Sequence, residues 1–346
     1  MTAGDRLAII GAGSWGTALA CALADGGPTV LWARTEELAQ RLARDRQNVK
    51  YLPDARIPAS VEVTHDLNLA LRGAAVVVMA VPAKAMEATA HGVSGILRTQ
   101  SRSGDAGPLV LSGAKGLDPE SGRRMCEVLA EALGDRAVVG AISGPNIARE
   151  VAMGLPTATV VASADRDRAV AAQRRMSGGR LRAYTNDDVV GVEIGGAMKN
   201  VIAIAAGIGD GMGAGDNAKA AIMTRGLVEM TRLGRALGAR QATFSGLTGL
   251  GDLIVTCNSP HSRNRQLGIA VGQGRALAEI EAGMNQVAEG VNTTREALRL
   301  GARLGIDLPI AQAVAAVLFD GQDLLSIAAA LMARTGRGEM EGLGIS

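Results

Sequence analysis

The stretch "LAIIGAGSWGTALACALA", residues 7–24, decides the fold of the N-terminal half of the chain. Its apolar run Leu7–Ile10 predicts a strand that is covered on both faces, as in the centre of a parallel sheet. The alanines that follow favour a helix. Gly11, Gly13 and Gly16 stand between the two in the spacing G-x-G-x-x-G, which is typical of dinucleotide-binding proteins.

Each of these glycines has a separate predicted task. Gly11 permits a tight turn, Gly13 leaves room for a pyrophosphate, and Gly16 lets the helix pack closely on the strand. The pyrophosphate would lie at the helix N-terminus, where free N–H groups and the helix dipole favour negative charge. In a chain with 46 glycines the spacing alone would also suit an ordinary turn, but the order strand, turn and helix makes dinucleotide binding the preferred interpretation.

The composition limits the class of protein. A chain of 346 residues is long enough for two domains with their own cores. The core must consist of aliphatic residues and methionine, because 47% of residues are hydrophobic and only 2% are aromatic. A net charge of +2 with scattered basic residues argues against nucleic-acid binding, for which we expect clustered basic residues and stacking aromatics.

Three cysteines, Cys21, Cys126 and Cys257, are widely spaced and odd in number, which predicts reduced thiols and a cytoplasmic protein. The first strand begins too early for a signal peptide to precede it. The run "AAVVVMAV", residues 74–81, is much shorter than the roughly 20 apolar residues that a membrane span requires. We therefore expect no membrane insertion.

Short strand-like runs alternate with helical segments up to residue 186, and we expect an α/β architecture: an N-terminal Rossmann-like doubly wound sheet followed by a C-terminal all-α domain. The dinucleotide-binding domain would span residues 1–186 and the helical, substrate-binding domain residues 187–340. The predicted strands are Leu7–Ile10, Thr29–Trp32, Val76–Val81, Leu109–Ser112, Ala137–Ala141, Thr157–Ala162 and Leu181–Tyr184, and the predicted helices of this half include Arg123–Leu133 and Asp165–Met176.

Helical periodicity dominates after Thr185. Asn186-Asp187-Asp188 looks like the capped start of a long helix that continues past Lys199. Apolar residues then recur every three or four positions between Ala220 and Leu237, with Gly238 as a C-terminal stop. Thr293-Thr294-Arg295-Glu296 reads as a capping box, and Pro309 suits a first helical turn.

The end of the second strand bears on the choice of nicotinamide cofactor. NAD-specific folds place an Asp or Glu there to bind the ribose hydroxyls, whereas this strand runs into Ala33 and Arg34. Glu36 and Glu37 come too late and should belong to the next helix. Since a guanidinium group can form paired hydrogen bonds with a 2′-phosphate, we favour NADPH over NADH; the alternative is that Arg34 is an ordinary surface residue.

Three polar residues in apolar surroundings are candidates for catalysis. Lys115 follows the predicted strand Leu109–Ser112 at the carboxyl edge of the sheet, where such folds bind ligands. Lys199 lies in an otherwise apolar helix together with Asn200, and a desolvated lysine exchanges its proton more readily near neutral pH. Asp252 is surrounded by glycines and apolar residues, so we expect it to have a partner such as Lys199.

Ser262, Arg263 and Asn264 form a dense group of donors that would suit a phosphate monoester. A helix cap followed by a surface arginine explains the same residues. The histidines, His65, His91 and His261, belong to no interpretable motif, and no His/Cys/Asp grouping has the spacing of a metal site, so we expect no metal.

Together these segments resemble the bacterial NAD(P)-dependent glycerol-3-phosphate dehydrogenase family, whose members reduce dihydroxyacetone phosphate to sn-glycerol 3-phosphate for phospholipid synthesis. The resemblance runs in family order over nearly the whole chain. The stretches that carry it are "GAGSWGTALA", "YLP", "KGL", "SGPNIAREVAMGLPT", "GGAMKNVIAIAAGIGDGMGAGDNAKAAIMTRGL", "GLTGLGDLIVTC", "SRNR" and "VAEG".

The resemblance implies that Lys199 donates and accepts the proton, with Lys115 and Asp252 beside it at the substrate. The substrate would also contact Gly144, Asn146, Ser262, Arg263 and Asn264. The cofactor, beyond the three glycines, would contact Ser14, Trp15, Arg34, Tyr51, Lys115, Ala148, Arg263, Val287 and Glu289. Asn146-Ile147 departs from the Ser/Thr-Phe that the family usually shows, so at Asn146 an amide would replace a hydroxyl.

Two other functions remain open. A β-hydroxyacid dehydrogenase would share the dinucleotide domain, the helical domain and a lysine with an asparagine on a helix, but it acts on carboxylates and leaves the Ser262–Asn264 cluster unexplained. A catalytically inactive NADPH-sensing protein would bind the cofactor without needing Lys115, Lys199 and Asp252 together. Glycine-rich helices are compatible with close packing in a homodimer, although the sequence does not fix the oligomeric state.

Overall fold

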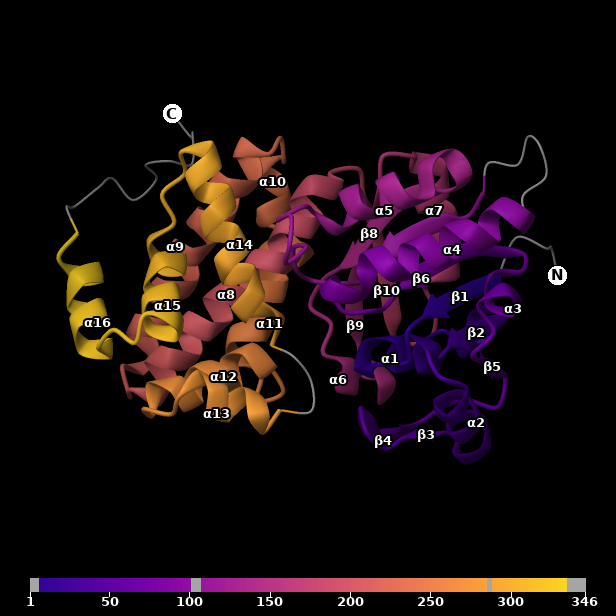
Figure 1. Ribbon diagram of the computed structural model, residues 1–346, viewed down its shortest axis with the longest axis horizontal. Coiled ribbons are helices and arrows are strands. Elements are labelled where there is room, and N and C mark those ends of the chain that lie inside the picture. The colour runs from indigo at the N-terminus through magenta and orange to yellow at the C-terminus, as the bar shows by residue number, and fades with distance from the viewer. Residues whose placement is uncertain (1–5, 101–106, 285–287, 335–346) are drawn as a thin grey trace. The chain divides into compact units, whose positions relative to one another are not determined.

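The chain divides into two compact units in the computed structural model, which describes residues 6–100, 107–284 and 288–334 (Figure 1). The first unit comprises Met1–Ala114 and Arg123–Val189, and the second comprises Lys115–Gly122 and Val190–Ser346. The division after Val189 lies three residues beyond the boundary expected from the sequence. The sequence gives no sign that the short segment Lys115–Gly122 belongs with the helical unit.

The first unit is built on an eight-stranded sheet in the order β10-β9-β8-β7-β6-β1-β2-β5. The strands of the sheet are β1 (Arg6–Ile10), β2 (Thr29–Trp32), β5 (Val61–Thr64), β6 (Ala74–Met79), β7 (Leu109–Ser112), β8 (Val138–Ser143), β9 (Thr157–Ser163) and β10 (Leu181–Asn186). The helices of this unit are α1 (Ser14–Ala22), α2 (Glu36–Asp45), α3 (Leu67–Leu71), α4 (Met86–Gln100), α5 (Met125–Leu133), α6 (Ala148–Ala152) and α7 (Arg166–Arg175).

The order of the strands confirms a doubly wound sheet. The chain builds outward from β1 through β2 in one direction and through β6, β7 and β8 in the other, so the strand order reverses between β1 and β6. All seven predicted strands are present, with ends that differ by at most two residues. One pairing departs from the parallel pattern, because β9 runs antiparallel to β8.

Both faces of this sheet are covered, as the apolar strands require. Alternate residues of the central strands face opposite sides. Leu7 and Ile9 of β1 pack in the cluster that includes α1, α2 and α7, whereas Ala8 and Ile10 pack with α3, α4 and α5. Figure 1 shows α4 and α5 side by side, in agreement with their direct contacts.

Three short strands were not expected from the sequence. Strand β5 forms an edge of the sheet and carries the alternating sequence "VEVT", which is too short for a clear signal. Strands β3 (Gln47–Asn48) and β4 (Leu52–Arg56) form a separate antiparallel pair. The sequence of β4 contains Pro53 and two charged residues, which are uncommon in a central strand.

The second unit is helical, as predicted. Its helices are α8 (Val189–Gly211), α9 (Gly215–Ala236), α10 (Gln241–Phe244), α11 (Asp252–Asn258), α12 (Arg263–Gly272), α13 (Leu277–Ala282), α14 (Glu289–Leu304), α15 (Pro309–Phe319) and α16 (Leu324–Met332). The stop at Gly238 is confirmed, since α9 ends at Ala236 and Gly238 has a φ of +92°. Pro309 lies in the first turn of α15, also as expected.

One predicted helix start, at Thr293, needs correction, whereas the predicted start after Asn186–Asp188 is confirmed. The capping box at Thr293–Glu296 is wrong, because α14 already begins at Glu289 and Thr293 Oγ1 donates to Glu289 O inside the helix. The sequence pattern misleads here because threonine can bond backward within a helix as well as cap one. At the start of α8, Asn186 Oδ1 accepts from Asp188 N at 2.9 Å, and the helix itself begins at Val189.

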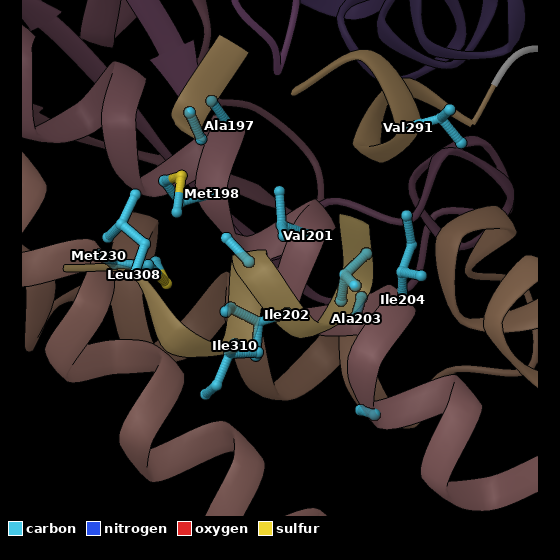
Figure 2. Packing of buried hydrophobic residues seen from close by; sticks show 14 of the residues in the cluster. Ala197, Met198, Val201, Ile202, Ala203, Ile204, Met230, Val291, Leu308 and Ile310 are labelled. Atoms are coloured by element: carbon cyan, nitrogen blue, oxygen red, sulfur yellow. The ribbon is translucent and has the colours of Figure 1, made fainter. Parts of the chain in front are cut away.

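Helix α8 is the centre of the helical core. Figure 2 shows Met198, Val201 and Ile202 of α8 among the side chains of this core, with Met230 of α9 and Ile310 of α15. The length and hydropathy of α8 would suffice for a membrane span, but 78% of its apolar window is buried inside the protein. It is therefore packed as the core helix of a globular unit.

Helices α8 and α12 cross at unusually short range because glycines face each other. A Cβ atom built on any of the four glycines at this crossing would collide with a backbone carbonyl oxygen of the opposite helix; they are Gly207, Gly211, Gly268 and Gly272. Both pairs are four residues apart and so lie on one face of their helix. These glycines, which the sequence made compatible with close packing in a homodimer, thus form a close contact between two helices of the same chain.

Buried Glu229 links α9 to the start of α15 and predicts a pH-dependent stability. Its carboxylate accepts from Ile310 N at 2.7 Å and from Ala311 N at 3.4 Å. Burial raises the pKa of Glu229 to about 7, against the opposing effect of these two bonds and of Arg232, while Asp307 adds to the rise.

A carboxyl group whose pKa is higher in the folded state binds its proton more tightly there. The stability that this proton contributes is complete below about pH 4.5 and is lost as the pH rises through 7. We expect wild type to lose up to about 3 kcal/mol relative to Glu229→Gln between pH 5 and pH 8. Urea unfolding of both proteins at the two pH values measures this difference, and parallel changes in the two proteins would contradict it.

Candidate active site

The glycine loop lies at the point where the strand order reverses. Strand β1 leads into Gly11, which has a φ of +117° and whose Cβ would lie 2.7 Å from Ala80 O at the end of β6. A Cβ on Gly16 would collide with Gly11 O. A side chain is therefore excluded at both positions by local packing. The loop lies at the place in the sheet where folds of this kind bind a ligand.

Gly13 differs from the other two glycines. A Cβ built there meets nothing within 4 Å, and Gly13 forms the N-cap of α1 without any capping side chain. The N-terminus of α1 is thus open to a ligand. Backbone N–H groups beside open space can bind a pyrophosphate. The residues of this loop therefore fit a dinucleotide.

The remaining expected cofactor residues of the first unit lie in several elements. Trp15 is in the first turn of α1, and its buried Nε1 has no hydrogen-bond partner in the described part of the chain. Tyr51 lies between β3 and β4, with Lys50 Nζ 5.2 Å from its ring centroid, and Ala148 begins α6. Val287 falls outside the described residues.

Arg34 is exposed two residues after the end of β2. The next residue, Thr35, caps α2 by accepting from Leu38 N at 3.3 Å. Glu36 and Glu37 belong to α2, as the sequence suggested. The charged group nearest along the chain to the end of this strand is therefore a guanidinium group.

A compact cluster of opposite charges lies within the helical unit. Asp252 Oδ1 accepts from Lys199 Nζ and Asp252 Oδ2 accepts from Lys115 Nζ, each at 2.6 Å. The Asp252 side chain is 1% exposed, that of Lys199 7% and that of Lys115 18%. The partnership of Asp252 with Lys199 is confirmed, and Lys115 shares the same carboxylate.

Close backbone packing brings Asp252 to Lys199. A Cβ on Gly195, one turn before Lys199 in α8, would lie 2.6 Å from Thr248 O. Thr248 belongs to a π-helical turn, Leu247–Gly251, that runs directly into α11 at Asp252. Gly195 lies one turn before Lys199, and Thr248 lies one turn before Asp252. The close approach of the backbones at Gly195 and Thr248 therefore sets the distance between the Lys199 and Asp252 side chains.

Thr256 is part of this cluster and was missed in the sequence. Lys199 Nζ donates to Thr256 Oγ1 at 2.6 Å, and Thr256 Oγ1 donates to Asp252 O at 2.6 Å. Its position one turn after Asp252 in α11 could have identified it, because residues four apart share a helix face.

The environment of Lys199 weakens its hold on a proton. Burial lowers the pKa of Lys199 to about 8; the charge of Lys115 acts in the same direction, while Asp252 opposes both. An ammonium group with such a pKa releases and recovers its proton within the physiological range.

A chain of amide hydrogen bonds joins this cluster to α12 and α14. Asn200 Nδ2 donates to Lys115 O at 2.8 Å, and Asn264 Nδ2 donates to Asn200 Oδ1 at 2.9 Å. Asn264 Oδ1 in turn accepts from Gly290 N at 3.0 Å. The amide of Asn264 is therefore already engaged at both ends, so its predicted part in binding phosphate rests on its second N–H.

Ser262 and Arg263 lie at the N-terminus of α12. Ser262 is the N-cap, since its Oγ accepts from Arg265 N at 3.3 Å, and Arg263 is exposed in the first turn. Glu289, at the start of α14, is close enough for its charge to act on Arg263. The arrangement matches the alternative given by the sequence, a helix cap followed by a surface arginine. Since the Ser262 hydroxyl accepts a hydrogen bond as the cap, its hydrogen can still be donated to a ligand.

Gly144 and Asn146 follow β8 in the first unit. Gly144 has a φ of +140°, which favours glycine. Asn146 Nδ2 donates to Ala158 O at 2.8 Å, and Asn146 Oδ1 accepts from Thr159 Oγ1 at 3.0 Å. The amide thus braces the turn against β9.

Other candidate chemistry finds no support in the described residues. None of their His, Cys, Asp and Glu side chains form a group of three that could hold a metal ion. His65, His91 and His261 are exposed. All three cysteines are free, and burial raises the pKa of Cys21 to about 11 and that of Cys257 to about 12, which makes both thiols unreactive.

Family models match both parts of the chain. Residues 6–169 match the N-terminal model of NAD-dependent glycerol-3-phosphate dehydrogenase, and residues 188–329 match the C-terminal model. Between the two matches lie only residues 170–187, around the division of the two units.

Relatives of this family match over nearly their full length. The glycerol-3-phosphate dehydrogenase [NAD(P)+] of Prosthecochloris aestuarii is 46% identical, with 96% of this chain and 99% of the relative covered. That of Moorella thermoacetica is also 46% identical, with 97% and 98% covered. The crystal structure of glycerol-3-phosphate dehydrogenase from Coxiella burnetii is 36% identical with a TM-score of 0.89 and covers 96% of this chain and 100% of its own. A ketopantoate reductase from Ralstonia eutropha, 18% identical with a TM-score of 0.58 and covering 90% of this chain and 96% of its own, shares the fold.

Proposed function

Because the chain belongs to the NAD-dependent glycerol-3-phosphate dehydrogenase family, we propose that it reduces dihydroxyacetone phosphate to sn-glycerol 3-phosphate with NADPH or NADH. It is thus an NAD(P)-dependent oxidoreductase acting on a CH–OH group. The observation that carries the proposal is the buried cluster in which Asp252 holds Lys199 and Lys115, one of them a lysine with a pKa of about 8.

The glycine loop would hold the dinucleotide. Gly13 leaves room for the pyrophosphate at the N-terminus of α1, and Ser14 and Trp15 follow in its first turn. When bound, the reduced nicotinamide would supply the hydride that reduces C2 of the ketone. Tyr51 and Ala148 are further cofactor contacts that the family resemblance supports.

Lys199 would supply the proton that the reduction requires. The Lys199 ammonium group would stabilise the negative charge that reduction places on the ketone oxygen and would donate its proton to that oxygen. Asp252 and Thr256 orient the Nζ atom, and the second ammonium group of Lys115 adds positive charge beside it. In the reverse direction the neutral amine accepts the proton.

The phosphate of the substrate would be held by the N-terminus of α12. Arg263 offers a guanidinium fork, Ser262 a hydroxyl hydrogen, and the helix start its partial positive charge. Asn264 supports this end of the site through its bonds to Asn200 and Gly290. Binding a part of the substrate that does not react positions the ketone for reduction.

A spectrophotometric assay tests the reaction. We expect dihydroxyacetone phosphate to drive the oxidation of NADPH and NADH at 340 nm, and sn-glycerol 3-phosphate to drive the reverse reaction. Oxidation of 3-hydroxy acids without any reaction of glycerol phosphate would instead identify a β-hydroxyacid dehydrogenase. Binding of NADPH without turnover of either substrate would identify a sensing protein.

Arg34 is proposed to select NADPH by binding its 2′-phosphate. We expect Arg34→Ala to raise the KM for NADPH by about tenfold or more, because a charge-assisted hydrogen bond contributes about 1.5–3 kcal/mol, and to change the KM for NADH little. Arg41→Ala is the matched control, since it removes an exposed guanidinium group from α2. Equal losses for both cofactors in Arg34→Ala would contradict the 2′-phosphate contact.

The cellular setting follows as a further proposal. Free cysteines support a reducing, cytoplasmic location. The product is the backbone of glycerophospholipids, so the reaction would supply phospholipid synthesis. A homodimer stays a prediction, which light scattering of the purified protein tests.

A further inference from the structure

Asn48 lies outside every motif considered so far, yet it contacts the glycine loop. We infer that Asn48 is a positioning residue for the dinucleotide: its amide fixes the peptide between Ala12 and Gly13 so that Gly13 N–H is directed at the pyrophosphate. The inference rests on the proposed function, because it concerns how the same loop binds its cofactor.

The Asn48 side chain is buried, and its amide nitrogen donates two hydrogen bonds. The residue is 1% exposed, and its Nδ2 donates to Ala12 O at 2.9 Å and to Thr17 Oγ1 at 2.8 Å. Both hydrogens of the amide therefore have acceptors. Since Ala12 belongs to the loop and Thr17 to the first turn of α1, one side chain holds the loop and the helix start together.

Because of the geometry of the peptide bond, the hydrogen bond from Asn48 to Ala12 O fixes the direction of Gly13 N–H. The Ala12–Gly13 peptide is trans, so its C=O and N–H groups point in opposite directions. With Ala12 O held inward by Asn48, Gly13 N–H must point away from Asn48. A donor whose direction is fixed before binding loses less freedom when the ligand arrives.

Asn48 also connects the loop to the β3–β4 pair. Its own carbonyl oxygen accepts from Tyr51 N at 3.1 Å, in the turn that carries the proposed cofactor contact Tyr51. The same residue thus ties two parts of the proposed cofactor site to each other. An amide that served only the packing of this unit would have no reason to affect affinity for the cofactor once the protein is folded.

Direct titration with NADPH, followed by nucleotide fluorescence, tests the inference without relying on turnover. We expect Asn48→Ala to raise the Kd for NADPH about tenfold, the value for one lost hydrogen bond of about 1.4 kcal/mol, with one site still present per folded chain. Asn48→Asp keeps the shape but places an oxygen against Ala12 O, and should weaken binding at least as much. Gln47→Ala is the matched control, because its amide bonds to Pro53 O within the hairpin, and it should leave the Kd unchanged.

Thr17→Val separates the two contacts of the amide. It retains the bond to Ala12 and should raise the Kd less than threefold. A lower melting temperature in both Asn48 variants with an unchanged Kd would overturn the inference, as would equal losses in Thr17→Val and Asn48→Ala. Failure of wild type to bind NADPH would overturn the proposed function itself and is recognised before any variant is measured.

Discussion

Lys199→Ala is expected to lower kcat for ketone reduction by about 10³-fold, within the range that general acid–base catalysis contributes. The fold should survive, because Asp252 keeps Lys115 as a partner and no buried carboxylate is left alone. The Kd for NADPH, measured by fluorescence, should stay within about twofold of wild type. A small primary amine such as methylamine should restore part of the rate by entering the vacated space.

Lys199→Arg distinguishes proton transfer from charge alone. Arginine keeps a positive charge beside Asp252 but does not release its proton in the accessible pH range. Its rate should therefore remain close to that of Lys199→Ala. A kcat near that of wild type in either variant would remove Lys199 from its proposed role.

The pH profile gives an independent check on Lys199. Reduction requires the ammonium form, so kcat should fall as the pH rises above about 8, while oxidation of glycerol phosphate should rise through the same range. Asp252→Asn removes the group that holds the pKa of Lys199 up. The decline in the reduction rate should then begin at a lower pH, and a profile unchanged by Asp252→Asn would contradict the assignment.

Gly207→Ala is expected to destabilise the protein by about 3 kcal/mol or more, at the upper end of what overpacking usually causes. The new methyl group would collide with Arg265 O, and a backbone carbonyl in a helix cannot move aside alone. The crossing of α8 and α12 must widen instead. Since Ser262–Asn264 begin α12 and Asn264 bonds to Asn200 of α8, activity should fall together with stability.

Gly209→Ala is the matched control in the same helix. There the methyl group would meet Ile222 Cδ1 at 3.5 Å, an ordinary van der Waals contact. Replacing a helical glycine by alanine favours the helix by about 1 kcal/mol, so this variant should be stabilised. Urea unfolding of the two variants should give changes of opposite sign, and similar changes would contradict the argument from the crossing.

Local patterns in the sequence were sufficient for most of the fold. Buried strands such as β2 and β7 were predicted to the residue, because continuous apolar runs between turns have few other interpretations. The edge strand β5 and the β3–β4 pair were not, since edges carry short and polar sequences. The start of α14 was misplaced because Thr293 has the same local chemistry inside a helix as at its cap.

The candidate site divides along a similar line. Asp252 required a partner on energetic grounds, and Lys199 was the evident choice. The bond of Lys115 to the same carboxylate joins residues 137 apart in the sequence, so no local pattern predicts it, and only the family resemblance placed Lys115 beside Asp252. The engagement of Asn264 by Asn200 and Gly290, and the bracing of Asn146 by β9, likewise depend on tertiary contacts.

The assignment of Lys115–Gly122 to the helical unit means that the polypeptide passes between the units three times, after Ala114, after Gly122 and after Val189. A fragment that starts at residue 187 would therefore lack one of the two ammonium groups bound to Asp252, however well its helices assembled. The helical half alone is therefore not a complete module that a gene fusion could transfer to another protein.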